Sequence, residues 1–215
     1  MIDSYLHRGL RQKLIKTLKR KGIKDQRILD AFQDIPRHYF LDPGFAEWAY
    51  KDIAFPIGNK QTISQPYTVA IQTILLDVKP KQKILEIGTG SGFQACVLAY
   101  LGAKVYTIER QRQLYIKTNT LLEKIGFGHI RTLYGDGYLG APKFAPFDRI
   151  LLTAGATDIP QTLLDQLKIG GIMVIPLGEG NTQEMVKITK ISETEIKKEK
   201  HGLFAFVPFL SGTNK

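Results

Sequence analysis

Residues 83–92 read KILEIGTGSG, in which a short apolar run gives way to glycine at every second position. The apolar run predicts a buried parallel strand, and Gly88, Gly90 and Gly92 allow a turn so tight that backbone faces whatever lies above it. An ordinary strand-to-helix turn seldom contains three glycines, because each costs about 0.5–1 kcal/mol of backbone entropy relative to alanine. We therefore interpret the stretch as a loop that holds a nucleotide-type cofactor.

The acidic residues around this loop indicate which cofactor it holds. A second apolar strand, residues 105–108, is followed by Glu109, whose carboxylate can accept both hydroxyls of a ribose. The glycine pattern is G-x-G-x-G preceded by Glu86, rather than the G-x-G-x-x-G with which dinucleotide folds seat a pyrophosphate. A carboxylate at the position of Glu86 would repel phosphates but suit a ligand that carries an ammonium and a sulfonium. We therefore predict S-adenosyl-L-methionine as cofactor and a methyltransferase as the class of enzyme.

Helix and strand patterns alternate through most of the chain. Residues 65–78 predict a helix that Lys79 and Pro80 end, while residues 38–58 read as irregular. Further predicted elements are an N-terminal helix, helices at 25–33, 93–101, 111–125 and 161–167, and strands at 104–108, 130–134, 147–153 and 172–176. This alternation predicts an α/β fold with a doubly wound parallel sheet that has helices on both faces and ligands at the carboxyl ends of its strands.

Length and composition predict one elaborated domain. The chain has 215 residues and 43% apolar content, enough for a full core. We assign residues 1–64 to an N-terminal helical and substrate-side extension and residues 65–215 to the cofactor-binding core, within one compact domain overall. Cys96 is the only cysteine and predicts a core thiol. No signal peptide or membrane-spanning stretch is apparent, so we expect a cytoplasmic protein without a membrane partner.

The net charge of +10 raises the possibility of a nucleic-acid partner. The basic residues of the N-terminal segment are Arg8, Arg11, Lys13, Lys16, Lys19, Arg20, Lys21 and Lys24. Leu10, Leu14 and Leu18 recur at helical spacing in the same segment, which places most of these charges on the outward face of an amphipathic helix. No aromatic residue lies among the charges to stack on bases, so we predict a solvated helix face and no nucleic-acid partner.

The other predicted strand ends also carry residues suited to a ligand. In the turn GDG at 135–137, Asp136 could accept the exocyclic amine of adenine while Gly137 lets the backbone approach the ring. Taken alone, the same turn has an equally good purely structural explanation. The next strand ends in TAGA at 153–156, where methyltransferases that act on base amines commonly have Asn or Asp followed by two prolines and an aromatic residue. Methylation of nucleic-acid amines is therefore disfavoured.

Residues 59–67, NKQTISQPY, precede the core in an otherwise irregular region. Ser64 is suited to cap the following helix, because its hydroxyl can accept a backbone N–H while Pro66 fits the first turn. The same hydroxyl could instead lie over the glycine loop and face an acceptor substrate. The two interpretations do not exclude each other.

These motifs together resemble the protein-L-isoaspartate O-methyltransferase family over nearly the whole chain. The stretches that carry the resemblance are QTISQPYTVA, ILEIGTGSGFQA, VYTIER, GDGYLG, APFDRILLTA, QLKIGGIMVIPLG and a closing FVPF, with the earlier IPRHYF and AYKDIAFPIG in matching order. The chain departs from the family pattern at TAGA, where TAAA or TAAP is more usual, and at VPFL, where VPL precedes a polar residue. Both departures concern the substrate cleft and not the reaction.

The resemblance implies a Rossmann-like class I methyltransferase sheet and methyl transfer from S-adenosyl-L-methionine to the free α-carboxylate of L-isoaspartyl residues in damaged proteins and peptides. The product cofactor is S-adenosyl-L-homocysteine, and the methyl ester closes to a succinimide that partly returns to normal aspartate. It also implies that Ser64 is the active-site residue. The implied cofactor contacts are Thr62 and Ile63, then Gly88, Thr89, Gly90, Ser91 and Gly92 at the methionine part, Glu109 at the ribose, and Asp136 with Gly137 at the adenine, beside Glu86.

Little catalytic apparatus is expected for this reaction. A carboxylate with a pKa of about 4 is already ionised at neutral pH and attacks a methyl group without a general base. Ser64 then holds the carboxylate through a hydrogen bond, and the motifs around the four histidines indicate no base and no metal site. We expect a monomer. Two alternatives from other classes remain: an RNA-binding protein with salt-dependent affinity, and a folded but inactive interaction module.

Overall fold

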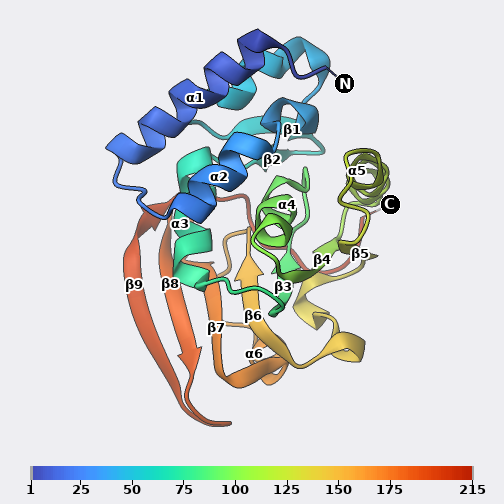
Figure 1. The fold of residues 1–215 in the computed structure, drawn as a ribbon. Coiled ribbons are helices and arrows are strands. Elements are labelled where there is room, and N and C mark those ends of the chain that lie inside the picture. The colour runs from blue at the N-terminus through green and yellow to red at the C-terminus, as the bar shows by residue number, and fades with distance from the viewer. Residues whose placement is uncertain (1, 215) are drawn as a thin grey trace.

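A mixed seven-stranded sheet forms the centre of the computed structural model, which describes residues 2–214 (Figure 1). The strand order is β5-β4-β3-β6-β7-β8-β9, with parallel pairing from β5 to β7 and antiparallel pairing from β7 to β9. The strands are β3 (Lys83–Ile87), β4 (Lys104–Glu109), β5 (Arg131–Tyr134), β6 (Phe147–Leu152), β7 (Leu167–Leu177), β8 (Gln183–Lys190) and β9 (Ile196–Phe204). The predicted α/β sheet is confirmed.

Helices cover both faces of this sheet. The α-helices are α1 (Tyr5–Arg20), α2 (Gln26–Asp34), α3 (Pro66–Leu76), α4 (Phe93–Tyr100), α5 (Arg112–Lys124) and α6 (Gln161–Asp165). Four 3₁₀ helices lie between them: η1 (Arg37–Phe40), η2 (Pro43–Tyr50), η3 (Gly137–Leu139) and η4 (Pro142–Phe144). Because both faces of the sheet are covered, apolar and polar residues do not alternate along its central strands. In β3, for example, Ile84 packs into the cluster under α1–α4, while Leu85 packs into the opposite cluster with α6.

Two antiparallel additions were not predicted. A short hairpin of β1 (Phe55–Gly58) and β2 (Gln61–Ile63) replaces part of the expected irregular region. β8 and β9 extend the sheet beyond the last predicted strand. The expected helix at 161–167 is too long, because α6 ends at Asp165 and Leu167 already pairs with Phe147 as the first residue of β7.

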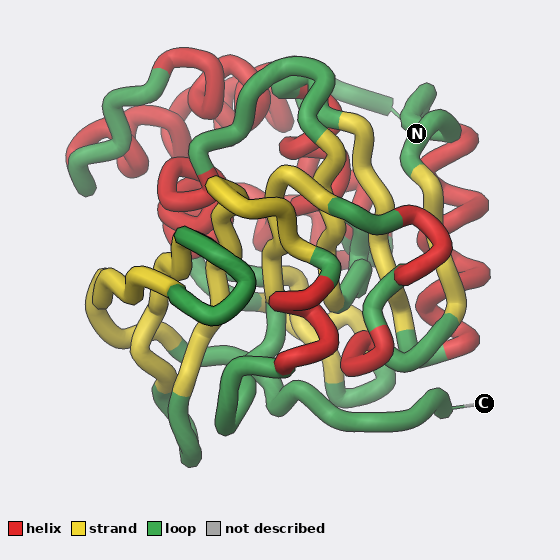
Figure 2. The backbone as a smooth tube through the Cα atoms, turned by 90° about the horizontal axis from the view of Figure 1, so that it is seen from below, coloured by secondary structure: helices red, strands yellow, loops and turns green. Residues whose placement is uncertain are grey.

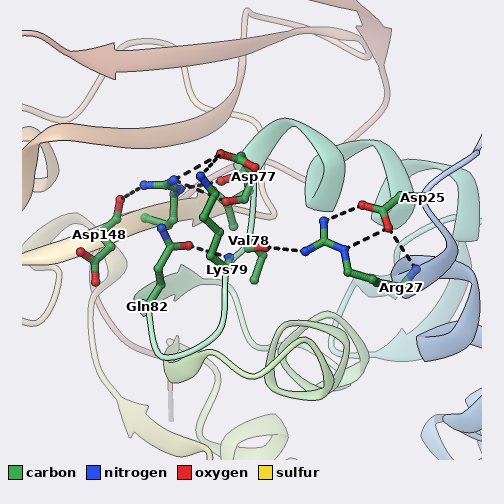
Figure 3. Close-up of polar contacts among 9 residues, drawn as sticks. Asp25, Arg27, Asp77, Val78, Lys79, Gln82 and Asp148 are labelled. Carbon is green, nitrogen blue, oxygen red and sulfur yellow. Dashed lines mark hydrogen bonds and ion pairs between the residues drawn. The ribbon is translucent and has the colours of Figure 1, made fainter.

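The N-terminal segment packs on the face that carries α3 and α4 (Figure 1). Phe32 of α2 meets Phe93 of α4 edge-to-face at 5.4 Å between ring centroids, and Leu18 of α1 belongs to the same hydrophobic cluster. Arg27, held by Asp25 at the start of α2, donates through Nη1 to the Val78 carbonyl after α3 at 3.2 Å (Figure 3). The N-terminal extension, residues 1–64, and the core that follows it therefore contribute residues to one hydrophobic cluster.

The basic face of α1 is exposed except at Arg11, which is 3% exposed and pairs with Asp3 at 2.7 Å. Ser4 caps the helix by accepting the His7 amide, and Leu14 and Leu18 form its buried stripe. Within residues 2–214, no helix combines the length and apolar character needed to cross a membrane.

The chain after β9 contains no helix or strand up to residue 214, and Figure 2 shows it as a loop that runs to the C-terminus. Isolated backbone bridges attach it to the core, among them Gly155 to Pro208 and Gln111 to Asn214. This segment therefore lies across the strand ends at which ligands are expected.

Candidate active site

A cavity of about 550 Å³ lies at the carboxyl ends of β3, β4 and β6. Its size is typical of a site for a small-molecule ligand. The sequence-predicted residues that line it are Thr62, Ile63, Ser64, Gly88, Thr89, Gly90, Ser91, Glu109 and Gly137. Residues from the extension and from the core therefore meet around one space, although they are far apart in the sequence.

The glycine loop approaches the end of β6 so closely that a side chain at its first position would collide. Gly88 has φ +95°, and a Cβ there would lie 2.5 Å from Thr153 Oγ1. The amides of Gly88 and Thr89 both donate to the Ile108 carbonyl, at 2.9 and 3.1 Å. Thr153 Oγ1 in turn donates to the Gly88 carbonyl at 2.7 Å. The loop is thus fixed on β4 and β6 with its backbone toward the cavity.

Glu109 lies at the end of β4 with its carboxylate held on both oxygens. Oε2 accepts the Gly90 amide and Oε1 accepts the Gln111 amide, each at 2.8 Å. The side chain is buried, and burial raises its pKa although these amides and Arg110 act in the opposite direction. Each carboxylate oxygen has a second lone pair, so the fixed group can still accept hydroxyls of a ligand.

Glu86 is fully buried behind the glycine loop and does not line the cavity. Thr107 Oγ1 donates to its Oε2 at 2.6 Å, while Oε1 has no partner among residues 2–214. Burial raises the pKa of Glu86 to about 8. The hydrogen bond from Thr107 lowers this pKa only in part, and the negative charge of the neighbouring Glu109 raises it further. Glu86 is therefore mostly protonated at neutral pH and supports the loop from behind, with Thr107 also bonded to Thr89 at 2.7 Å.

The GDG turn reaches the cavity through Gly137 and not through Asp136. Asp136 accepts the Tyr138 amide at 2.9 Å and the Gly212 amide at 2.7 Å, so its carboxylate fastens the C-terminal segment. A Cβ on Gly137 would contact Ile87 and lie 2.9 Å from the Phe209 ring. Gly92 also lies outside the cavity wall, at the start of α4.

The expected helix cap by Ser64 is wrong. α3 begins at Pro66 as predicted, but Gln65 occupies the cap position without a side-chain hydrogen bond. Asp52, from the loop before β1, instead accepts the Tyr67 amide at 2.8 Å. A distant carboxylate therefore takes the capping role, and the Ser64 hydroxyl at the cavity wall is not consumed by it.

Several residues that line the cavity were not among the individually predicted site residues, although the FVPF motif contains four of them. They include Phe204 at the end of β9, and Phe206, Val207, Pro208 and Phe209 of the C-terminal segment that follows it. Gly155 fixes this segment by donating to the Val207 carbonyl and accepting the Phe209 amide, both at 2.8 Å. A Cβ on Gly155 would lie 2.8 Å from Gln183 Cδ, which gives a packing reason for glycine in TAGA. Phe209 also stacks on Tyr138 at 3.9 Å.

Cys96 and three of the histidines lie away from the cavity, whereas His201 lines it. Cys96 is fully buried, and burial raises the pKa of its thiol, which makes it an unreactive core residue. Asp3, His7 and His38 lie close together under α1, but His7 and His38 stack face to face at 3.8 Å. Both ring nitrogens of His38 already have hydrogen-bond partners, Nδ1 with Tyr50 Oη at 2.6 Å and Nε2 with the Ile2 carbonyl at 3.2 Å.

Comparison with known proteins identifies a single family. The sequence profile described as Protein-L-isoaspartate(D-aspartate) O-methyltransferase matches residues 9–214. Proteins named protein-L-isoaspartate O-methyltransferase from Flavobacterium johnsoniae and Christiangramia forsetii are 55% and 52% identical over 214 residues, covering 100% of both chains in each case.

Two solved structures have a similar fold. One, titled protein-L-isoaspartate O-methyltransferase, is 29% identical with a TM-score of 0.83, and the match covers 92% of this chain but 65% of that one. The other is a putative protein-L-isoaspartate O-methyltransferase from Plasmodium falciparum in complex with S-adenosyl-L-homocysteine. It is 24% identical with a TM-score of 0.82, and the match covers 93% and 98% of the two chains.

Proposed function

The chain belongs to the protein-L-isoaspartate(D-aspartate) O-methyltransferase family, and from this premise we propose how its own residues carry out the reaction. It is a repair enzyme that transfers a methyl group from S-adenosyl-L-methionine to the free α-carboxylate of L-isoaspartyl residues. The observation that carries the proposal is that the QTIS segment and the glycine loop line the same cavity. One side of this cavity suits the cofactor and the other suits the acceptor.

The glycine loop and its neighbours fit the cofactor. When bound, S-adenosyl-L-methionine supplies a methyl group on a positively charged sulfur. At Gly88 and Gly137 a Cβ would collide with neighbouring side chains of the protein, so glycine lets both backbone segments pack closely at the cavity wall. The proposed contacts are Thr62, Ile63, Thr89, Gly90 and Ser91 around the methionine part, Glu109 at the ribose and Gly137 at the adenine, with Glu86, Gly92 and Asp136 supporting these segments from behind.

Ser64 is proposed to hold the acceptor. The substrate carboxylate is ionised at neutral pH, so the chain needs no base to activate it. A hydroxyl at the wall can donate one hydrogen bond to a carboxylate oxygen and leave the other oxygen for the reaction. Phe204 and Phe206 line the same cavity and help to exclude water. Alignment of this kind contributes up to about 7–11 kcal/mol in well-oriented model reactions.

Ser64→Ala tests this assignment. We expect a loss of about tenfold in kcat/KM for an isoaspartyl peptide, as for one hydrogen bond of about 1.4 kcal/mol. S-adenosyl-L-homocysteine affinity, measured by calorimetry, should stay within twofold because the glycine loop is untouched. Ser192→Ala removes a hydroxyl that accepts amides in the exposed turn before β9 and serves as control. Full turnover of Ser64→Ala would remove Ser64 from the active site.

The proposed physiological form is a cytoplasmic monomer that acts on isoaspartyl peptides and proteins, without nucleic-acid or membrane partners. Two features support it. Cys96 is a buried free thiol, as is usual in a reducing compartment, and the basic residues of α1 are spread along a solvent-facing helix. An isoaspartyl peptide and its normal aspartyl twin, compared with labelled cofactor, test the substrate. Light scattering tests the monomer, and methyl transfer to the aspartyl twin at the same rate would contradict the specificity.

A further inference from the structure

The IPRHYF motif contributes a buried cation behind the active-site serine. Arg37, in η1, is 2% exposed, and its Nη2 donates to the Ser64 carbonyl at 2.6 Å. Its guanidinium carbon lies 4.6 Å from the centroid of the Phe93 ring. Nε and Nη1 have no hydrogen-bond partner among residues 2–214. The Ser64 carbonyl is thus the one polar contact of this guanidinium in the described chain.

The AYKDIAF motif holds the other side of the same turn. Asp52 Oδ1 accepts the Tyr67 amide at 2.8 Å, and the Asp52 carbonyl accepts Gln65 Nε2 at 3.0 Å. Lys21 of α1 pairs with Asp52 Oδ2 at 2.6 Å. The segment 64–67 is therefore held at the Ser64 carbonyl by the buried Arg37, and at positions 65 and 67 by the partly buried Asp52.

Ser64 needs such support because it belongs to neither neighbouring element. β2 ends at Ile63 and α3 begins at Pro66, so the Ser64 carbonyl lies outside both backbone hydrogen-bond patterns. Holding this peptide group restrains ψ of Ser64, and with it the position of the Cα–Cβ bond from which the hydroxyl projects. A buried guanidinium with so few bonds is an unfavourable way to satisfy one carbonyl if stability alone is at stake.

Building on the proposed function, we propose that Arg37 is a positioning residue: it holds the Ser64 peptide group so that the hydroxyl faces the substrate carboxylate. Asp52 fixes the following residues and leaves this one peptide to Arg37. Arg37 itself does not line the cavity and touches neither substrate nor cofactor.

The opposite end of α3 provides a matched control. Arg149 is also buried, at 7% exposure, and its Nε donates to the Leu76 carbonyl at 2.7 Å. It lies with Asp77 and Asp148 at the far end of the helix, as Figure 3 shows for these two carboxylates, and it does not line the cavity. Arg149→Met therefore removes a buried arginine contact to the same helix, together with the bonds of Arg149 to Asp77 and Asp148, and touches no bond of Ser64.

The experiment is a double-mutant cycle of Arg37→Met with Ser64→Ala, run below the melting temperature of every variant. The readouts are kcat and KM for an isoaspartyl hexapeptide, and calorimetric affinity of the S-adenosyl-L-homocysteine complex for that peptide. We expect Arg37→Met to lower kcat/KM and peptide affinity about tenfold when Ser64 is present and less than twofold in the Ser64→Ala background. Arg149→Met should change both by less than twofold in either background.

A second variant, Arg37→Lys, tests the same role if Arg37→Met does not fold. Arg37→Lys keeps the cation over Phe93 but has a shorter side chain with a single donor group, so it weakens the contact to Ser64 without removing the charge. We expect a loss of about threefold that again disappears in the Ser64→Ala background. Equal losses in both backgrounds, for either variant, would overturn the positioning role while leaving Ser64 in the active site. Full turnover of Ser64→Ala alone would instead contradict the proposed role of Ser64, and the role of Arg37 with it.

Discussion

Glu86→Gln should remove a pH dependence from the stability of the fold. Glu86 is fully buried, and its carboxyl has a single bond, from Thr107 Oγ1. Burial raises its pKa to about 8 from an ordinary value of 4.5. The folded protein therefore holds this proton at pH 7, while the unfolded chain has released it. Glutamine has nearly the same shape as the protonated acid and no proton to release.

The sign and size follow from proton linkage. Below pH 4.5 both states of Glu86 are protonated, and its contribution to stability is fully present. As the pH rises toward 8 the unfolded chain is increasingly favoured, by about 1.4 kcal/mol for each pH unit. The upper limit of this loss over the whole window is about 5 kcal/mol. Between pH 5.5 and 7.5 the free energy of unfolding of the parent should fall by about 2–3 kcal/mol relative to Glu86→Gln.

Urea unfolding followed by circular dichroism, at several pH values from 5.5 to 8.5 without cofactor, measures this difference. Glu109 also has a raised pKa and lowers the stability of both proteins with pH, so the comparison isolates Glu86. Glu123→Gln, on the exposed face of α5, serves as control and should follow the parent. Parallel curves for the parent and Glu86→Gln would refute the reasoning. A parent that gains stability relative to the variant would mean that Glu86 is ionised and paired in the fold.

Two further changes probe the cofactor side. Glu109→Ala leaves the Gly90 and Gln111 amides without their acceptor, each at a cost of about 1–3 kcal/mol, and should weaken S-adenosyl-L-homocysteine binding at least tenfold by calorimetry; parental affinity would contradict this assignment. Gly88→Ala introduces a Cβ 2.5 Å from Thr153 Oγ1 at a positive φ and should cost about 1–3 kcal/mol in urea unfolding. Gly44→Ala, with open space around it, should be neutral, and equal stability of the two variants would show that the loop adapts.

The central strands were predictable because their sequence records burial on both faces. β3 (KILEI) and β6 (FDRILL) each contain a short apolar run, residues 84–85 and 150–152, whose side chains are buried on both faces under helices. β9 reads IKKEKHGLF, has few apolar residues and forms the sheet edge, so its strand state depends on pairing with β8. The β1–β2 hairpin is only a few residues long on each side and contains Pro56. Neither carries a local pattern strong enough to predict a strand.

The site shows the same division between local and distant information. The position of the glycine loop and of Glu109 at one cavity could be predicted, because each directly follows a strand that the local sequence pattern identifies. The contacts of Arg37 with Ser64 and of Asp52 with Tyr67 join positions 27 and 15 residues apart, and no spacing rule indicates them. The expected cap by Ser64 was wrong for this reason. Ser64 is a suitable residue at a suitable position, but the tertiary fold brings the Asp52 carboxylate to the helix start, where it accepts the Tyr67 amide.

The distribution of charge around the cavity fits a reaction that consumes charge. A positively charged donor and an anionic acceptor become neutral products, so the transition state carries less charge than the reactants. A fixed cation against the carboxylate would stabilise the reactants more than the transition state and slow the chemical step. Ser64, which is proposed to hold the acceptor, offers a neutral hydroxyl. Among the described residues, the one lysine or arginine that lines the cavity is Arg110, which follows Glu109 at the end of β4. The nearby cation of Arg37 is kept behind the wall, where it can orient Ser64 without contacting the carboxylate itself.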